Sequence, residues 1–422
     1  MDADLIVVGA GAAGLAAARS LARHSMRVQL VEARDRIGGR VFSYPIAGIP
    51  TPAELGAEFI HGSAAQTRAL LREAGSAAID MGGEAWSRER GELARDDKRF
   101  FEAAGIFEAA LSLPNDESVD GFLQRFATDP QRREIASSAR EFVEGFEAAD
   151  PGLASVRAIA EEIGTGVDST SARPLGGYAP IFHQLRNDCA AAGVELHLST
   201  VVRRIVWGPN GVALDVLDSR GAVRTLEARA AILTLPVGVL RHRGDECEIV
   251  FEPELPHPKR KALASIEMGH VVKVALWFRT AFWEALDDGR YRDGAFFYVE
   301  GEPIPTYWTQ LPVRSELAAA WVGGPRAVAL ANRSPAELVG AALDGFGALF
   351  NARDLARREF EDGTMHDWSN DRFARGAYSY VAVNGGDARA RLAAPLANAL
   401  FFAGEATSSD GQGGTVNGAL ET

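Results

Sequence analysis

The N-terminal part of the chain has the pattern of a strand, a helix and a second strand. Leu5–Val8 is a short, wholly apolar run, as a buried parallel strand requires. Residues 15–23 have helical periodicity, and Val28–Val31 is a second apolar run that ends on Glu32. The pattern therefore predicts a βαβ unit over residues 4–32.

The rest of the chain alternates between helical and strand patterns. Helices are predicted over 64–73 and 336–349, with two further amphipathic patches within 117–148. Strands are predicted over 194–198, 201–206, 212–216, 230–235, 271–278, 296–299, 319–322 and 399–402. This alternation predicts an α/β fold: a Rossmann-like domain built from discontinuous segments, with an α+β substrate-binding domain inserted into it. We assign residues 1–80, 175–250 and 385–422 to the first domain, and residues 81–174 and 251–384 to the second.

A glycine-rich turn, GAGAAG at residues 9–14, joins the first predicted strand to the first predicted helix. In a dinucleotide site, Gly9 makes the tight turn, Gly11 lets a pyrophosphate approach the backbone, and Gly14 lets the helix pack closely. The phosphates would lie at the helix N-terminus, and Glu32 would accept hydrogen bonds from a ribose. Because these parts occur in the required order, we predict a dinucleotide-binding site.

Charge and cysteine content exclude several other classes. The 422 residues carry 44 Lys+Arg and 57 Asp+Glu, a net charge of -13. A nucleic-acid-binding protein needs a basic face, so we expect no nucleic-acid partner. The two cysteines, Cys189 and Cys247, form neither a disulfide framework nor a CxxC pair. We therefore expect reduced thiols and no metal site.

No apolar run approaches the ~18 residues of a membrane helix. The N-terminus has no basic segment followed by a cleavable apolar one, because a strand pattern begins at Leu5. We therefore expect a soluble, cytoplasmic protein with no membrane span in this chain. The sequence stops at Thr422 inside a predicted helix, which suggests a truncated chain or a further tail.

A second glycine turn, ARDRIGGR at residues 33–40, follows Glu32 and carries arginines. With the first turn, it strongly resembles the FAD-binding opening of the flavin amine oxidase family. Further motifs follow in the family's order: LGAEFIHG at 55–62, GGY at 176–178, TLPVGVL at 234–240, GAYSY at 376–380, FAGE at 402–405 and GTVNGA at 414–419. Residues 60–62 and 376–380 look most like those of polyamine oxidases and their histone-demethylase relatives.

The resemblance implies FAD as the cofactor. Glu405 would bond the ribityl chain, the Val416 N–H would meet the pyrimidine end of the flavin, and Val202 would lie beside the adenine. Ala377 stands where monoamine oxidases carry the cysteine that bonds the flavin, so FAD would be non-covalent. The implied cofactor-binding residues are Gly9, Gly11, Ala13, Gly14, Glu32, Arg34, Gly39, Arg40, Gly56, Ala57, Glu58, Phe59, Val202, Glu405, Thr415 and Val416.

Lys273 is the candidate catalytic residue. It lies in the otherwise apolar strand 271–278 of a chain whose other lysines are Lys98, Lys259 and Lys261. A buried ammonium is costly unless it is paired or its pKa is lowered. One alternative is an edge-strand lysine that reaches solvent. The resemblance implies instead the family lysine that holds a water against flavin N5, which is the role we favour.

Four further residues are candidates for substrate binding by resemblance: Tyr378 as one wall of an aromatic cage, Thr415 at the place of the opposite wall, Trp368 beside the isoalloxazine, and His61 at the mouth of the site. An aromatic wall favours a cation. Monoamine oxidases carry a second Tyr at the position of Thr415, so the cage is half built here. The alternatives are a packed core Tyr, a core Trp and a structural His.

We therefore expect an FAD-dependent amine oxidase. A hydride leaves the carbon beside the nitrogen, the imine hydrolyses to an aldehyde, and O2 reoxidises the flavin to give H2O2. A polyamine-type substrate is expected. The alternatives are an L-amino-acid oxidase, a desaturase-type flavoprotein, and a flavin-binding protein without turnover. The sequence leaves the particular amine and the oligomeric state open.

Overall fold

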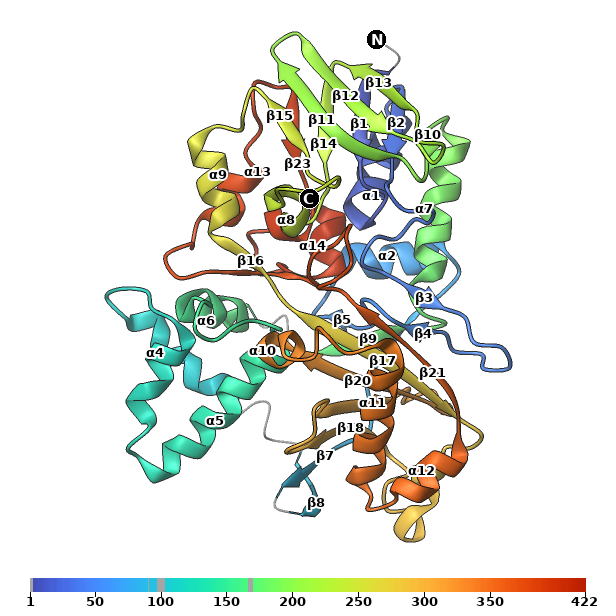
Figure 1. The fold of residues 1–422 in the computed structure, drawn as a ribbon, viewed down its shortest axis with the longest axis vertical. Coiled ribbons are helices and arrows are strands. Elements are labelled where there is room, and N and C mark those ends of the chain that lie inside the picture. The colour runs from blue at the N-terminus through green and yellow to red at the C-terminus, as the bar shows by residue number, and fades with distance from the viewer. Residues whose placement is uncertain (1–2, 90, 97–102, 166–169) are drawn as a thin grey trace.

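The computed structural model describes residues 3–89, 91–96, 103–165 and 170–422; Lys98 lies outside these ranges (Figure 1). At the top of Figure 1 is a five-stranded parallel sheet in the order β10-β2-β1-β14-β23. Its strands are β1 (Leu5–Val8), β2 (Val28–Val31), β10 (Glu195–His197), β14 (Ala230–Leu233) and β23 (Leu400–Phe402). Helices α1 (Ala12–Arg23) and α7 (Ala179–Ala191) pack beside it. The predicted Rossmann-like domain built from separate segments is confirmed.

Three smaller groups of elements complete this half of the molecule. An antiparallel meander, β11 (Val201–Gly208), β12 (Gly211–Leu217) and β13 (Val223–Ala228), is joined by β15 (Val250–Glu252). Short strands β5 (Ile60–His61), β6 (Ala78–Asp80) and β9 (Ser171–Pro174) form a second group, and β3 (Ser43–Tyr44) pairs with β4 (Ala53–Glu54). The helices are α2 (Ala65–Glu73), α8 (Val237–Arg241), α9 (His257–Ala264), α13 (Ala388–Ala393) and α14 (Val416–Glu421).

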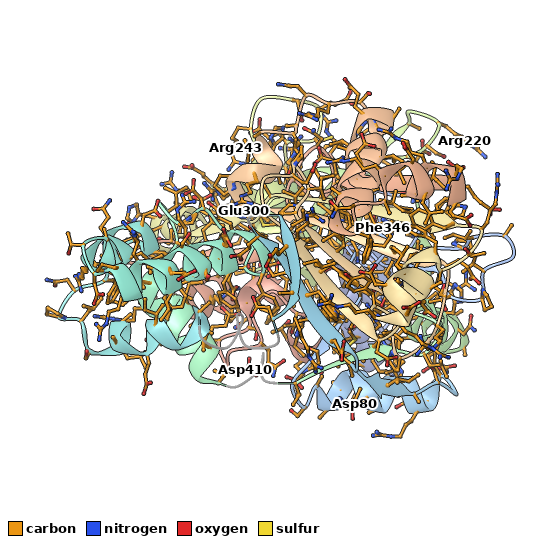
Figure 2. The ribbon with its side chains drawn as sticks, turned by 90° about the horizontal axis from the view of Figure 1, so that it is seen from below. Asp80, Arg220, Arg243, Glu300, Phe346 and Asp410 are labelled. Atoms are coloured by element: carbon orange, nitrogen blue, oxygen red, sulfur yellow. The ribbon has the colours of Figure 1, made fainter. Side chains whose placement is uncertain are left out.

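The other half contains a seven-stranded sheet in the order β21-β17-β20-β19-β18-β7-β8. Its strands are β7 (Glu84–Glu89), β8 (Glu92–Arg95), β17 (Val271–Phe278), β18 (Gly294–Val299), β19 (Thr306–Thr309), β20 (Leu317–Gly323) and β21 (Phe360–Asp367). Helices α11 (Pro335–Leu349) and α12 (Arg353–Glu359) cover one face, where Phe346 of α11, labelled in Figure 2, belongs to the same apolar cluster as Val274 and Leu276 of β17. The opposite face is left for the site.

A helical lobe projects to one side of this sheet (Figure 2). It contains α4 (Val119–Leu123), α5 (Pro130–Gly145) and α6 (Val156–Gly164), with α10 (Gly324–Val328) against α5. Its core is apolar and includes Phe107, Phe122, Phe142 and Val143. Strands β16 (Ile266–Met268) and β22 (Ser379–Val381) pair where the two halves of the molecule meet.

Two features bear on the remaining expectations. Leu255, Ala262 and Met268 belong to the segment assigned to the second domain, but they pack in the apolar cluster that contains residues of β1 and β14. The domain boundaries at residues 250 and 385 stay a prediction. Among the described residues, no helix has the length and apolarity needed to cross a membrane.

Candidate active site

A long cavity begins at the carboxyl ends of β1 and β2 and reaches the seven-stranded sheet. The space inside it, including open solvent at its mouth, is about 1390 Å³. The residues that line it come from the β1–α1 turn, the loop after β2, the segments around residues 200 and 234, and the C-terminal motifs. The cavity therefore has the position expected for a dinucleotide in an open α/β sheet.

The glycine turn has the geometry that the motif requires. Gly9 has φ +105°, and a Cβ on Gly14 would lie 1.8 Å from the Gly9 carbonyl oxygen, so helix α1 packs directly on the turn. Gly11 is the N-cap of α1 and has no side chain to satisfy the first N–H groups of the helix. A Cβ on Gly39 would lie 3.4 Å from the Gly11 Cα, so the two glycine turns adjoin. These residues fit a pyrophosphate at the helix N-terminus.

Glu32 lies at the end of β2 and lines the cavity. Its two carboxylate oxygens accept the backbone N–H groups of Ala10 at 2.7 Å and Arg34 at 2.9 Å. Burial raises the pKa of this carboxyl, against the lowering effect of those two hydrogen bonds. The two backbone bonds fix the carboxylate beside the first glycine turn, where it can accept further hydrogen bonds from a ribose.

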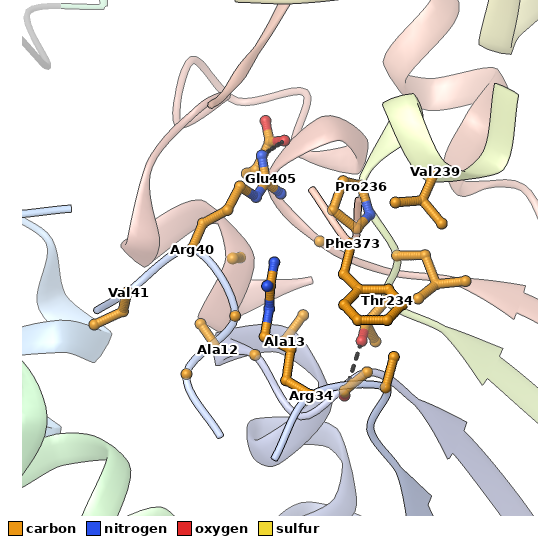
Figure 3. A pocket seen from close by; sticks show the side chains of 18 of the residues that line it. Ala12, Ala13, Arg34, Arg40, Val41, Thr234, Pro236, Val239, Phe373 and Glu405 are labelled. Atoms are coloured by element: carbon orange, nitrogen blue, oxygen red, sulfur yellow. Dashed lines mark hydrogen bonds and ion pairs between the residues drawn. The ribbon is translucent and has the colours of Figure 1, made fainter. Parts of the chain in front are cut away.

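Two arginines bring charge to the cavity, and both are held by buried carboxylates. Arg40 pairs with Glu405 at 2.7 Å, and the two side chains lie together in Figure 3. Burial would raise the pKa of Glu405, but the charges of Arg40 and Arg389 outweigh it and the pKa is lowered. Arg34 pairs with Asp371 at 2.7 Å, which ties the second glycine turn to the segment after β21.

Thr415 and Val416 line the cavity at the start of helix α14. The Thr415 hydroxyl accepts a hydrogen bond from the Gly418 N–H at 2.9 Å and donates one to the Gln412 carbonyl at 2.8 Å. Thr415 therefore caps the helix, and Val416 is its first residue. Val202 lies elsewhere along the same cavity wall.

Lys273 lies on β17, an inner strand between β21 and β20, and is 2% exposed. The alternative of an edge-strand lysine in solvent is wrong. Its ammonium donates to Glu58 Oε2 at 2.6 Å and to the Gly56 carbonyl at 3.1 Å, and it lies 5.1 Å from the centroid of Trp308. Since Gly56 lines the cavity, the ammonium lies directly behind the cavity wall.

Glu58 is the centre of a buried ion cluster. Besides Lys273, it pairs with Arg173 of β9 at 3.1 Å, and Gln310 donates to it at 3.4 Å. Burial alone would raise the pKa of Glu58, but the charges of Lys273 and Arg173 outweigh burial and lower it. The cluster holds two cations against the Glu58 carboxylate, and the buried Glu54 carboxyl interacts electrostatically with Lys273 and Glu58.

Aromatic rings line the end of the cavity that reaches the seven-stranded sheet. Trp368, Tyr378 and Trp321 all contribute to the lining. Trp368 donates its indole N–H to the Leu55 carbonyl at 2.8 Å. Tyr378 and Trp321 lie nearly parallel, with 14° between the ring planes and 6.5 Å between their centroids. Tyr378 is half-buried, so it differs from a fully packed core tyrosine.

His61 is half-buried beside the rings of Phe59 and Phe146. Its Nδ1 lies 3.3 Å from the Ser171 hydroxyl, and burial lowers its pKa to about 4. The ring is therefore neutral at pH 7 and offers a hydrogen-bonding nitrogen without a charge.

Of the predicted site residues, most line the cavity itself: Gly9, Gly11, Ala13, Glu32, Arg34, Gly39, Arg40, Gly56, Ala57, Val202, Trp368, Tyr378, Glu405, Thr415 and Val416. Gly14, Glu58, Phe59, His61 and Lys273 lie outside the set of described residues that line it. Their individual roles stay predictions.

The sequence did not single out several residues of the site, among them Trp321, Phe373 and Arg173. Trp321 and Phe373 line the cavity, and Arg173 pairs with Glu58. A lone Trp or Phe is as typical of a core as of a site. Arg173 is one of many arginines, and its place near the GGY motif is the local signal that could have pointed to it. Strand pairing in space brings these side chains to the site.

Comparisons with known proteins agree with this geometry. The family model of the flavin containing amine oxidoreductases matches residues 12–422. Polyamine oxidase 4 of Oryza sativa subsp. japonica is 27% identical, over 99% of this chain and 86% of that protein. Lysine-specific histone demethylase 1 homolog 3 of Arabidopsis thaliana is also 27% identical, over 100% of this chain but 29% of that protein. The chain spans 56% of a second demethylase homologue, homolog 2 of Oryza sativa subsp. japonica.

Two solved structures share the fold. Putrescine oxidase bound to putrescine superposes with a TM-score of 0.80 and 20% identity, over 100% of this chain and 97% of that one. Cyclohexylamine oxidase from Brevibacterium oxydans IH-35A gives a TM-score of 0.81 and 22% identity, over 100% of this chain and 98% of that one. With the family model across nearly the whole chain and a cavity that fits FAD, the protein belongs to the flavin containing amine oxidoreductases.

Proposed function

We propose that the protein oxidises a small-molecule amine with non-covalently bound FAD and O2. One observation carries the proposal. Three aromatic rings, those of Trp321, Trp368 and Tyr378, line the cavity, and Gly56 of the same wall accepts a hydrogen bond from Lys273, which is paired with Glu58. Ring faces of this kind can hold an amine.

Bound FAD would supply acceptance of a hydride from the carbon beside the amine nitrogen and delivery of the electrons to O2, giving H2O2. Water hydrolyses the resulting iminium to an aldehyde and the remaining amine. The chain's own residues bind and orient. Arg40 and the N-terminus of α1 would hold the pyrophosphate, and Glu32 would hold the ribose.

On the substrate side, the aromatic rings exclude water and orient the amine. Lys273 Nζ is held at a fixed place behind Gly56 by Glu58, where it would donate a hydrogen bond to a water beside the bound cofactor. Ala377 lines the cavity at the place where monoamine oxidases carry the flavin-bonding cysteine, and an alanine cannot form that bond.

A polyamine is the substrate class that the motifs favour. The IHG and GAYSY segments resemble those of polyamine oxidases, and polyamine oxidase relatives are matched over 86% of their length. The net charge of -13 also attracts polycations at long range.

One observation favours a second candidate, an amine with a single charged nitrogen and an apolar or aromatic body. Ring contacts run from Trp321 to Trp308 at 5.9 Å, then to Phe59 at 5.4 Å, and Phe59 also contacts Phe296 at 5.9 Å. Two cations lie over these rings, Lys273 over Trp308 and Arg173 over Phe59. Glu58 is bound to both of them, so it is not open to a second ammonium.

Anaerobic mixing of the holoenzyme with a panel of amines tests the proposal and separates the two classes. The panel is spermine, an acetylated polyamine, phenylethylamine, cyclohexylamine and L-amino acids, with the visible absorbance of the flavin as the readout. Bleaching by any amine supports the proposed function, and the faster class identifies the substrate. Bleaching by L-amino acids alone would replace it with amino-acid oxidation. A bound flavin that no compound bleaches would favour a desaturase-type or non-catalytic protein.

For the location, we propose the cytoplasm. Cys189 and Cys247 are both buried, free thiols, which suits a reducing compartment. Fractionation with a tagged full-length chain tests this, and a membrane or secreted pool would contradict it.

A further inference from the structure

Glu54 has a buried carboxyl group whose two oxygens have unequal surroundings. The Ser43 hydroxyl donates to Oε1 at 2.7 Å, and the Tyr178 N–H donates to the same oxygen at 2.8 Å. Among the described residues, Oε2 is buried and has no hydrogen-bond partner. Two donors on one oxygen and none on the other are the arrangement of a neutral acid, in which Oε1 is the carbonyl oxygen and Oε2 carries the proton.

The surrounding fold builds this arrangement. Ser43 of β3 is directly opposite Glu54 of β4, so strand pairing places its hydroxyl beside the carboxyl. A Cβ on Gly177 would lie 2.1 Å from Oε1, and Gly177 has φ +79°, so this glycine of the GGY motif leaves room for the carboxyl. The next residue, Leu55, packs in an apolar cluster with Ala275 of β17. Apolar surroundings and an unbonded oxygen both disfavour the ionised carboxylate.

Charged groups lie close enough to act on this carboxyl. Burial raises the pKa of Glu54 to about 7; the two hydrogen bonds and the charge of Lys273 lower it, and the charge of Glu58 raises it. The Tyr178 phenol at the start of α7 also faces Glu54, but it donates to the Phe59 carbonyl at 2.9 Å and burial raises its pKa, so it stays neutral.

The state of Glu54 therefore decides the charge of the ion cluster. While Glu54 is neutral, Lys273 and Arg173 exceed the Glu58 carboxylate by one positive charge. Ionisation breaks the Oε2–H bond, releases the proton to solvent and leaves a second carboxylate, which cancels that excess. Since Lys273 also donates to the carbonyl of Gly56, which lines the cavity, the change occurs directly behind the cavity wall.

We propose that Glu54 is held as a neutral acid and that its ionisation lowers the reduction potential of the bound flavin. A negative charge added behind the wall opposes the addition of electrons to the cofactor, and buried charges are weakly screened. Glu54 lies outside the described residues that line the cavity, so it acts through the ion cluster. This role goes beyond the proposed function, since it concerns the flavin with no amine bound.

The test measures the reduction potential of the flavin in the holoenzyme at pH ~5 and ~9, by stepwise addition of dithionite with a reference dye. Glu54→Gln keeps an oxygen that accepts from Ser43 and Tyr178 but cannot ionise. It should match wild type at pH ~5 and have the higher potential at pH ~9. The difference should be about tenfold in the equilibrium constant for reduction, as a unit charge gives across about 10 Å of protein. The exposed Glu134→Gln is the control and should follow wild type at both pH values.

Two further readouts do not depend on the size of that difference. The infrared spectrum of wild type minus that of Glu54→Gln should contain the carbonyl band of a protonated carboxyl at pH ~5 and lose it at pH ~9. Ser43→Ala removes a donor that lowers the pKa of Glu54, so the pH at which the potential begins to fall should move upward.

Equal potentials of wild type and Glu54→Gln at pH ~9, or a difference spectrum without the band, would overturn the assignment. If Glu54→Gln yields no holoenzyme, Ser43→Ala decides, and an unchanged pH dependence of its potential overturns it. A wild-type flavin that dithionite reduces but no amine reduces is a different result, because it refutes the proposed function and leaves the role of Glu54 intact.

Discussion

Lys273 Nζ and Glu58 Oε2 lie 2.6 Å apart in a site where both side chains are almost fully buried. The pair is part of a cluster in which Arg173 is a second cation on the same carboxylate. The two partners are therefore not equivalent. Removing the lysine leaves Glu58 still paired, whereas removing the carboxylate leaves two buried cations together.

This asymmetry predicts the order of two stability losses. Glu58→Gln should cost about 3–5 kcal/mol of unfolding free energy, as expected for a buried charge left without its partner. Lys273→Met should cost less, because Arg173 still neutralises Glu58. Urea unfolding of each variant at neutral pH measures both, and the double variant should recover part of the Glu58→Gln loss. A larger loss for Lys273→Met would contradict the role of Arg173.

Two glycines of the first turn should separate folding from cofactor binding. Gly14→Ala places a Cβ 1.8 Å from the Gly9 carbonyl oxygen, so we expect a loss above about 4 kcal/mol or no folded protein. Gly11→Ala meets nothing closer than 4.0 Å within the protein, so it should fold. It should still bind FAD at least about tenfold more weakly, because its methyl group occupies the approach of the pyrophosphate. Melting temperature and flavin content of purified protein distinguish the two effects, and a Gly11→Ala variant with full flavin content would contradict the phosphate assignment.

Glu54 should make the fold less stable at alkaline pH. Burial raises the pKa of its carboxyl to about 7, against the hydrogen bonds from Ser43 and the Tyr178 N–H. The pKa of Glu54 is higher in the folded than in the unfolded chain. Its contribution to the stability of the fold is therefore complete below pH ~4.5 and is lost as the pH rises through about 7. The unfolding free energy of Glu54→Gln relative to that of wild type should therefore rise by about 2–3 kcal/mol from pH ~5 to pH ~9. The exposed Glu134→Gln is the control and should follow wild type.

His61 should make the fold less stable at acid pH. Burial lowers its pKa to about 4 from 6.5, so the unfolded chain binds the proton more readily. The contribution of His61 is complete above pH ~6.5 and is lost as the pH falls toward ~4. Thermal melts in this window should show a weaker acid dependence for His61→Gln than for wild type or for the exposed His24→Gln. Equal acid dependence in all three proteins would show that His61 is accessible to water.

The flavin should leave the protein on denaturation. Ala377 offers no sulfur at the place of the flavin-bonding cysteine of monoamine oxidases. Cys189 lies on α7 outside the cavity lining, and Cys247 lines the cavity in a different segment of the chain, with Ile249 and Val239. Acid precipitation should therefore release all visible flavin absorbance into the supernatant. Colour that stays in the pellet would reveal a covalent bond.

Patterns of buried residues predicted the elements that are apolar along their own length. β17 spans the predicted residues 271–278, β2 spans Val28–Val31, and α11 begins one residue before its predicted start. By contrast, β21 reads FEDGTMHD and has no apolar alternation. It exists because its backbone pairs with β17, and local sequence carries no sign of that pairing.

The residues of the site likewise fall into two groups, those predicted from local sequence and those that depend on tertiary packing. Gly9, Gly11 and Glu32 were predicted because all the parts of the turn are close in sequence. The Trp321–Tyr378 pair depends on strand register, on the end of α5 and on a loop after β21, three features set by tertiary packing.

The order of strands in the parallel sheet also has a consequence for biosynthesis. β1 forms near the start of translation, but its neighbour β14 is at residues 230–233, and β23, which completes that edge, is at residues 400–402. At ~5–20 residues per second, β1 and β2 wait roughly 20–80 s on the ribosome before β23 exists. The edge of β1 is unpaired until β14 is made, and the edge of β14 is then unpaired until β23 is made. Each unpaired edge is a template for misassociation. Because residues as late as Ala419 line the cavity, its lining is complete only in an almost finished polypeptide.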